Sequence, residues 1–227
     1  MPAAGIHRAG RFVIRSRAFT HRKGFPVPHP FIESILTRRS QYALGRNLPL
    51  PRAEVVQLIE DAVRHSPSSY NSQSSRAVIL FGEHSEKLWE FVREVLSART
   101  APDAFTRTAA RLRSFQEGAG TVLFFEDQDT VRGLQAKFPA IADKFPTFSE
   151  HSSGMAQFAV WSALAAAGIG ASLQHYYEPL VDERIAATWD VSTAWKIRAQ
   201  MPFGSNESPP NVKTFIDDAV RFKVFGD

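Results

Sequence analysis

Two clusters of polar residues in the first third of the sequence combine side chains that are suited to a phosphorylated ligand. Arg38-Arg39-Ser40 follows a predicted helix. Two guanidinium groups and a hydroxyl suit a phosphate dianion, because arginine makes bidentate, charge-assisted hydrogen bonds to phosphate oxygens. Residues 67–74, here called the serine-rich loop, are, apart from Tyr70, small or amide-bearing residues that could contact the edge of a polar heterocycle. Each cluster by itself also fits a simpler structure, namely a solvated helix end or a connecting loop.

Two further clusters lie in the C-terminal third. Gln174 and His175 follow a short predicted strand, where side chains and backbone N–H groups can reach a crevice. The alternative interpretation is that His175 has only a structural role. Lys213, Arg221 and Lys223 form a basic group near the C-terminus, which is also compatible with a solvated charged end.

Hydrophobic periodicity and turn residues predict the elements that must position these clusters. Helices are expected at about residues 30–37, 51–65, 85–98, 102–115 and 152–167. Strands are expected at about residues 77–81, 121–125, 171–173 and 195–203, with residues 222–225 as a further candidate. Apolar and polar residues alternate along residues 195–203, so one face of that strand should be buried. Residues 138–148 read as an aromatic, proline-punctuated loop, and Phe138, Phe145 and Phe148 are candidates for a lid over a substrate.

Composition narrows the possible classes. The 227 residues suit one domain, and the absence of cysteine excludes disulfides, a thiolate nucleophile and cysteine-ligated metals. The high phenylalanine count of 18 indicates an apolar ligand pocket or a large subunit interface. No apolar run is long enough to cross a membrane. The common hydrolase, zinc-protease and P-loop motifs are missing, Gly168-Ile169-Gly170 reads as a helix stop, and the histidines lack metal-ligand spacing.

The positive charge is concentrated in the N-terminal segment. The whole chain has a net charge of +4, yet without residues 1–30 it holds 21 basic and 23 acidic residues, a net charge of −2. Nucleic-acid binding by the folded body therefore loses most of its support. Residues 1–28 are predicted to be a basic, disordered extension of a domain at 29–227. We expect a cytoplasmic location. The alternative is that residues 1–28 act as an organellar transit peptide.

Taken together and in order, the clusters resemble the FMN-dependent nitroreductase family, especially its small-chain Frm2/Hbn1-like branch. The resemblance covers residues 31–227 and is carried by Arg38-Arg39-Ser40, residues 66–73 and 121–127, Leu173-Gln174-His175-Tyr176 and residues 223–226. It implies an α+β fold in which helices flank a central, mainly antiparallel sheet. It also implies an intertwined homodimer with FMN bound between the subunits.

The resemblance further implies the residues that contact FMN. They are Arg38, Arg39, Ser40, Ser68, Ser69, Asn71, Gln73, Leu173, Gln174, His175, Lys213 and Arg221. Arg38 and Ser40 would hold the phosphate and ribityl chain. The serine-rich loop would contact the flavin from the partner subunit, and residues 173–175 would lie along the isoalloxazine. Lys213 and Arg221 would add phosphate-binding cations.

The implied activity is a two-step, ping-pong reduction of a small nitroaromatic or quinone-type acceptor by NADH or NADPH. The chemistry takes place on FMN. No metal is expected, and no side chain is assigned as an acid or base. Two alternatives stay open. One is a protein that stores or senses FMN without turnover. The other is a binder of nucleic acid or anionic membranes that acts through residues 1–28.

Overall fold

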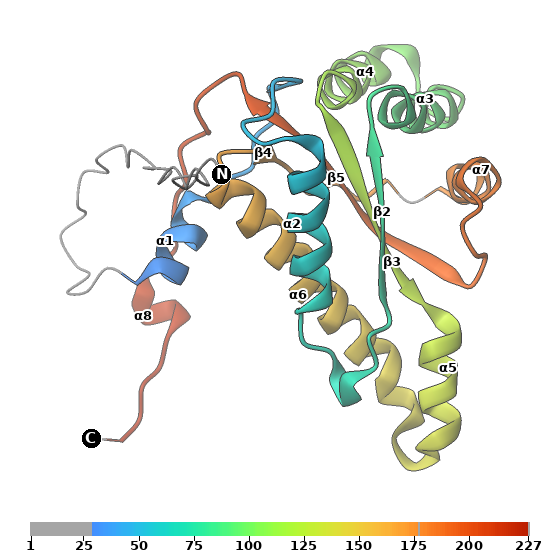
Figure 1. Ribbon diagram of the computed structural model, residues 1–227, viewed down its shortest axis with the longest axis vertical. Helices are drawn as coiled ribbons and strands as arrows, with labels where there is room; N and C mark the ends of the chain where they lie inside the picture. The colour runs from blue at the N-terminus through green and yellow to red at the C-terminus, as the bar shows by residue number, and fades with distance from the viewer. Residues whose placement is uncertain (1–28, 177, 227) are drawn as a thin grey trace, which may run out of the picture.

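The computed structural model describes residues 29–176 and 178–226, so the predicted basic extension lies outside the described residues. The strands are β1 (Leu44–Gly45), β2 (Ser75–Phe81), β3 (Gly120–Asp127), β4 (Gly170–Ala171) and β5 (Trp195–Asn206). The helices are α1 (Pro30–Thr37), α2 (Arg52–Arg64), α3 (Glu83–Ser97), α4 (Pro102–Gln116), α5 (Gln128–Lys137), α6 (Phe145–Ala166), α7 (Pro179–Trp189) and α8 (Asp218–Arg221). Two 3₁₀ turns are η1 (Ser69–Asn71) and η2 (Pro139–Lys144). The predicted α+β class is confirmed (Figure 1).

The sheet is antiparallel throughout its strand pairs, in the order β1-β5-β3-β2, with β4 also pairing with β5. β3 is the central strand: β2 pairs with it along the whole length of β2, from Ser75 opposite Glu126 to Phe81 opposite Gly120. A bulge at Phe124 and Phe125 shifts its register with β5. The central position of β3 explains why it is an uninterrupted apolar run, since both of its faces are covered.

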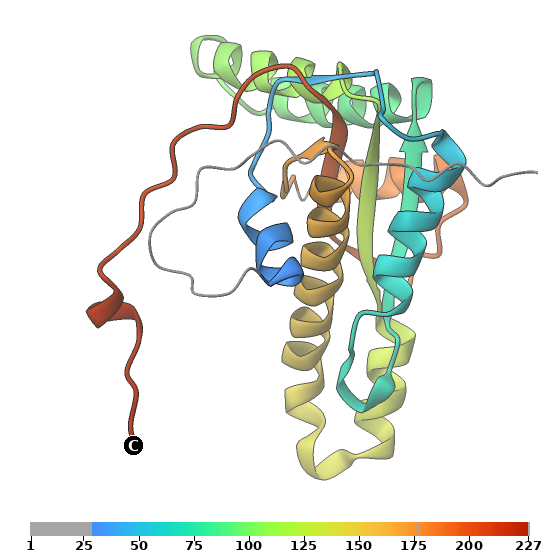
Figure 2. The same cartoon turned by 60° about the vertical axis from the view of Figure 1, so that its left-hand side comes forward.

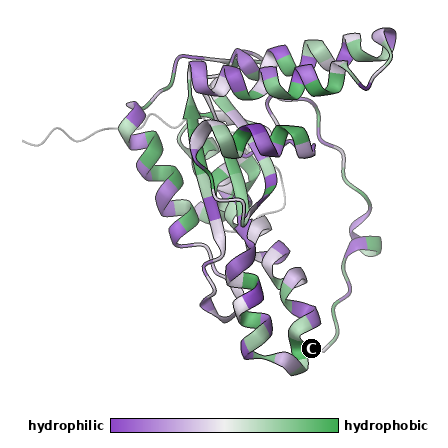
Figure 3. Cartoon of the chain, turned by 90° about the vertical axis from the view of Figure 1, so that its right-hand side faces the viewer, coloured by the Kyte–Doolittle hydropathy of each residue, from purple (hydrophilic) through white to green (hydrophobic). Residues whose placement is uncertain are grey.

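Helices cover both faces of the sheet. In Figure 1, α3, α4 and α7 lie on one face and α2 and α6 on the other. Each face has its own apolar core: Trp89 and Phe115 belong to the first, and Val55, Ile59 and Leu164 to the second. Figure 3 shows apolar strands at the centre of the molecule and helices such as α2 and α3 that carry a polar and an apolar side. No helix in the described part of the chain is long and apolar enough to span a membrane.

The expected aromatic loop at residues 138–148 is wrong. The chain forms α5, which the sequence analysis missed, then the turn η2, and α6 begins at Phe145 instead of near Ser152. Phe145 is only 2% exposed and packs against Phe138, Phe148 and Tyr70. The prolines begin helical turns here, since a proline in the first turn costs no hydrogen bond. Phe145 is therefore a core residue in this chain and does not serve as part of a lid.

The predicted buried face of β5 is confirmed, since Ala199, Met201 and Phe203 are fully buried. The opposite face is exposed at Lys196 but is also buried from Gln200 onward, which the alternation did not predict. Gln200, on the predicted polar face, is fully buried. Its side-chain oxygen accepts a hydrogen bond from the Tyr176 backbone N–H at 2.9 Å, and its amide donates to the Tyr176 carbonyl at 3.0 Å. A polar residue on a strand can thus mark a buried hydrogen-bonded position as well as an exposed one.

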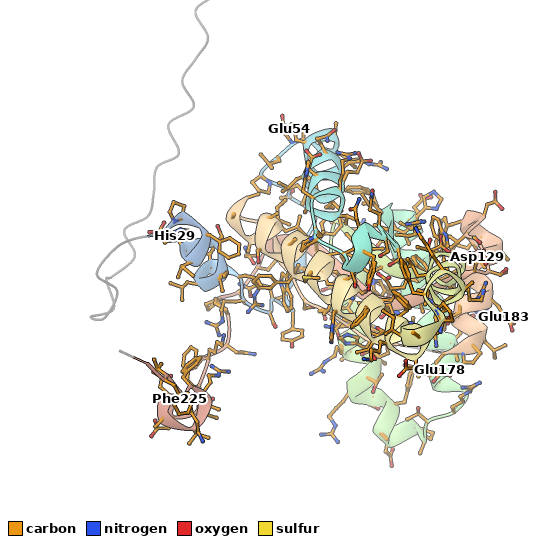
Figure 4. All side chains as sticks on the ribbon, turned by 90° about the horizontal axis from the view of Figure 1, so that it is seen from below. His29, Glu54, Asp129, Glu178, Glu183 and Phe225 are labelled. Carbon is orange, nitrogen blue, oxygen red and sulfur yellow. The ribbon has the colours of Figure 1, made fainter. Side chains whose placement is uncertain are left out.

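The candidate strand at residues 222–225 is also wrong. After β5 the chain continues as an arm, residues 207–226, which holds only the short helix α8 and leaves the body beside α1 (Figures 1 and 2). Its apolar side chains lie open to solvent, with Val212 at 93% and Phe225 at 89% exposure. Figure 4 shows Phe225 well away from the sheet and its helices. Residues 222–225 therefore pair with no strand of the described residues, and their apolar side chains stay exposed.

Asp182 on α7 carries a prediction about stability. Burial, together with the nearby Glu178, raises the pKa of its carboxyl to about 6, and one of its oxygens lacks a hydrogen-bond partner among the described residues. Because the folded state disfavours the ionised form, the carboxylate reduces stability at pH values above about 6. Asp182→Asn should therefore raise the free energy of unfolding at pH 8 by about 1 kcal/mol, a figure reduced for partial solvent exposure.

Urea unfolding at pH 8 and pH 4 measures this effect. The stabilisation should fade between pH 6 and pH 4, because the wild-type carboxyl becomes protonated over that interval. Glu183→Gln, on the exposed residue next to Asp182 in α7, is the control that removes one negative charge from the same region. Equal stabilisation by both variants, or no fading at pH 4, would contradict the assignment to Asp182.

Candidate functional site

A groove of about 490 Å³ brings together three of the predicted site residues. Arg38, Ser40 and Leu173 line it, opposite a row of residues from α6, namely Gly154, Gln157, Phe158 and Trp161. The volume lies within the range of small-molecule sites. Segments that are far apart in sequence meet here because Ser40 forms a parallel bridge with Ala171, whose carbonyl also accepts from the Gln41 N–H at 2.9 Å. The Trp161 indole donates to the same carbonyl at 3.1 Å.

Arg38 gives the groove a positive charge. The Arg38 guanidinium carbon lies 4.3 Å from the centre of the Trp161 ring, a cation–π contact that orients the side chain. Burial, followed by the neighbouring Arg39 charge, lowers the pKa of Arg38, although an arginine stays protonated. Neither arginine forms an ion pair with a carboxylate of the described residues. The groove therefore offers an uncompensated cation to an anionic ligand.

Arg39 is directed elsewhere. Its guanidinium donates a hydrogen bond to the backbone carbonyl of Asn211 in the arm. Adjacent residues after the end of a helix point in different directions, so Arg38 and Arg39 do not act as a pair at one point. In this chain Arg39 fastens the start of the arm to the body.

Residues 173–176 run along β5 beside the groove. The backbone of Gln174 pairs with Gln200 in both directions, at 2.7 and 2.9 Å, and its side-chain amide donates to the Ser172 hydroxyl at 3.0 Å. His175 is exposed. Of the predicted residues in this segment, Leu173 faces the groove, while Gln174 is engaged in the sheet.

The serine-rich loop contains η1 and lies on the other side of α6 from the groove. Its Ser69 N–H donates to the hydroxyl of Ser152 on α6 at 3.4 Å. At 3.6 residues per turn, the groove residues Gly154 and Trp161 lie about half a turn from Ser152 around the helix. Figure 2 shows the same arrangement, with α1 and α2 on opposite sides of α6. Ser68 caps the loop internally by accepting from the Gln73 N–H at 2.9 Å, and Asn71 and Gln73 are exposed.

The two predicted C-terminal cations lie on the arm and do not line the groove. Lys213 lies over the ring of Phe215, and Arg221 lies beside Phe222. Within one chain, the predicted residues thus fall into three separate groups: the groove, the serine-rich loop and the arm.

The sequence analysis missed the contribution of α6 to the groove. Gly154, Phe158 and Trp161 recur at helical spacing on one face, which is the signal that the sequence offered, and the structure leaves open space beside Gly154. The apolar character of the whole helix obscured this signal, because α6 packs against α2 on one side and α1 on the other.

Comparison with known proteins agrees with this geometry. Residues 35–205 match the model of the nitroreductase family. The chain belongs to this family. Two curated relatives are from Saccharomyces cerevisiae: the putative nitroreductase HBN1, 35% identical, and the nitroreductase FRM2, 33% identical. Both alignments span 193 residues, 84% of this chain and 95% of the relative.

Solved nitroreductases have the same fold. The Lactococcus lactis nitroreductase CinD in complex with nicotinic acid superposes with a TM-score of 0.80 at 47% identity, over 86% of this chain and all of CinD. A putative nitroreductase from Desulfovibrio desulfuricans in complex with FMN superposes with a TM-score of 0.63 at 15% identity, over 88% of this chain and all of the other. The α+β class and the family resemblance are thereby confirmed.

Proposed function

We propose that this nitroreductase is an FMN-dependent oxidoreductase that uses NADH or NADPH to reduce small nitroaromatic or quinone-type acceptors. The observation that carries the proposal is a groove lined both by Arg38, which has no ion pair among the described residues, and by the apolar side chains of Phe158, Trp161 and Leu173. A phosphate on an aromatic, apolar body has the matching chemistry. The complex of the Desulfovibrio protein with FMN, in the same fold, supports this choice of ligand. We also propose that residues 29–227 form the flavin-binding unit and residues 1–28 an extension to it.

The residues that line the groove would contact different parts of FMN. Arg38 and the Ser40 hydroxyl would bind the phosphate, where the cation is already oriented by Trp161. Leu173 and Phe158 would pack on the apolar part of the ligand and exclude water. When bound, FMN supplies the transfer of hydride between the nicotinamide donor and the acceptor. No side chain of the groove is required to act as an acid or base.

The remaining predicted contacts support a site that is shared by two chains. The serine-rich loop lies on the opposite side of α6 from Arg38, so Ser68, Ser69, Asn71 and Gln73 would reach an FMN held by a second copy. Exposed apolar side chains favour such a homodimer: Phe31 and Leu36 on α1, and Phe222 and Val224 on the arm. Lys213 and Arg221, carried by that arm, would complete the phosphate site in the partner.

The acceptor class is inferred from a relative. CinD, which is 46–47% identical to this chain, has been solved in complex with chloramphenicol and with 4-nitrophenol. An open apolar groove imposes few polar requirements on a bound molecule. We therefore expect several nitroaromatic compounds and quinones to be reduced.

The test is the visible spectrum of the purified protein before and after the addition of NADH or NADPH without oxygen. We expect a yellow protein that bleaches within seconds and regains its colour when a nitroaromatic acceptor is added. A colourless protein that FMN cannot reconstitute would contradict the proposal. A yellow protein that dithionite bleaches but neither nicotinamide does would favour the storage or sensing of FMN.

A further inference from the structure

Glu126 is a carboxylate entirely removed from water, at the end of β3 and outside the groove. It is 0% exposed, and no cation of the described residues forms an ion pair with it. Three hydroxyls donate to it instead: Ser74 at 2.5 Å, Ser75 at 2.5 Å and Ser149 at 2.6 Å. Hydrogen bonds of this kind offset the large cost of burying a carboxylate. They also tie three segments to one point, because Ser74 ends the serine-rich loop, Ser75 begins β2 and Ser149 lies on α6.

The serine-rich loop has a backbone that needs such support. Tyr70, Asn71 and Gln73 have φ angles of 56°, 50° and 50°, in the left-handed region that side chains with a Cβ disfavour. Such conformations persist where the surrounding structure enforces them, and they concentrate at functional sites. A loop of this shape is not selected by local preference alone.

Contacts at both ends of the loop enforce the shape. At one end, the Tyr70 ring lies 4.9 Å from the ring of Phe138 and 5.5 Å from that of Phe145, measured between ring centres. At the other end, the hydroxyl of Ser74 is held by Glu126. Between these points Asn71 and Gln73 point outward and are exposed. Glu126 also holds α6 through Ser149, one turn before Ser152, which contacts the loop at Ser69.

We propose that Glu126 is the positioning residue of the serine-rich loop: its carboxylate fixes Ser74 and α6 relative to each other and so holds Asn71 and Gln73 in place for a ligand. That the ligand is the FMN of a second copy rests on the proposed function. Glu126 itself touches neither the groove nor the exposed side chains, so its effect passes through the three serines. Loss of the carboxylate loosens the loop without removing any side chain that contacts the ligand.

The test compares Glu126→Ala with Thr121→Val in the full-length protein. Thr121 lies at the other end of the same strand, is fully buried, accepts a hydrogen bond from the Trp89 indole at 2.9 Å and shares one with Ser85 at 2.7 Å. Both variants break a buried hydroxyl network, so both should lower the melting temperature. Only Glu126→Ala should speed amide hydrogen exchange in residues 69–74, by about ten-fold or more, and raise the Kd for FMN by a similar factor.

Two milder variants test the proposal even if Glu126→Ala does not fold. Glu126→Gln keeps the volume and one acceptor, so it should restore most of the loop protection, and Ser149→Ala removes one hydrogen bond of the three. Unchanged loop exchange in Glu126→Ala, Glu126→Gln and Ser149→Ala would overturn the proposal. So would faster exchange with an FMN affinity equal to that of Thr121→Val. If the wild type binds no FMN, the proposed function fails, while hydrogen exchange still decides whether Glu126 holds the loop.

Discussion

Arg38→Ala is expected to weaken FMN binding by about 10- to 150-fold. Hydrogen bonds to a charged partner contribute about 1.5–3 kcal/mol, which corresponds to that range of Kd. The physical reason is that Arg38 is half-buried in the groove, oriented by Trp161 and not neutralised by a carboxylate of the described residues. Fluorescence titration of the apoprotein with FMN measures the effect. Titration with riboflavin, which lacks the phosphate, should show no loss.

Arg52→Ala is a matched control for this variant. The Arg52 guanidinium carbon also lies 4.3 Å from the centre of an aromatic ring, that of Phe81, but outside the groove. The Arg52→Ala variant loses the same charge and the same type of stacking contact as Arg38→Ala, so its FMN affinity should equal that of the wild type. Equal losses for Arg38→Ala and Arg52→Ala would show a general charge effect. A riboflavin affinity that falls as much as the FMN affinity would show that Arg38 does not bind the phosphate.

Truncation of the chain after Ser208 is expected to convert the proposed homodimer into a monomer and to abolish FMN binding at micromolar concentration. The arm that is removed makes little use of its apolar side chains within its own chain, since Val212, Val224 and Phe225 are each about nine-tenths exposed. Burial of one large apolar side chain stabilises by about 1.5–3 kcal/mol, so several of them on a second copy suffice for a stable dimer. The body should keep its fold, because both apolar cores lie in residues 29–206.

Light scattering after size exclusion measures the mass, and the visible spectrum measures bound flavin. Val224→Glu and Leu180→Glu separate the arm from the rest of the surface, since both place a carboxylate at an exposed aliphatic position, one on the arm and one on α7. Only Val224→Glu should raise the dimer dissociation constant, by about ten-fold or more. A truncated chain that stays dimeric and yellow would contradict a site shared through the arm.

Local sequence patterns determined most of the elements around the groove. Val55 and Ile59 repeat at helical spacing, and they are fully buried on α2 as expected. The apolar run at residues 121–125 became the central strand β3, and Gly168 ended α6 with a positive φ. Such features depend on neighbours in sequence: helix periodicity, turn residues and the length of an apolar run. The family resemblance, which depends on the order of short motifs, was available at the same level.

Tertiary contacts decided the rest. Arg38 and Arg39 are adjacent in sequence, yet one stacks on Trp161 and the other reaches the arm at Asn211. Glu126 had no signal of its own, because its three serine partners come together only when β2, β3 and α6 pack. Whether the apolar residues of the arm form a strand or meet a second copy depends on partners that are remote in sequence. Periodicity reports only that a face needs burial, and three-dimensional packing determines which surface buries it.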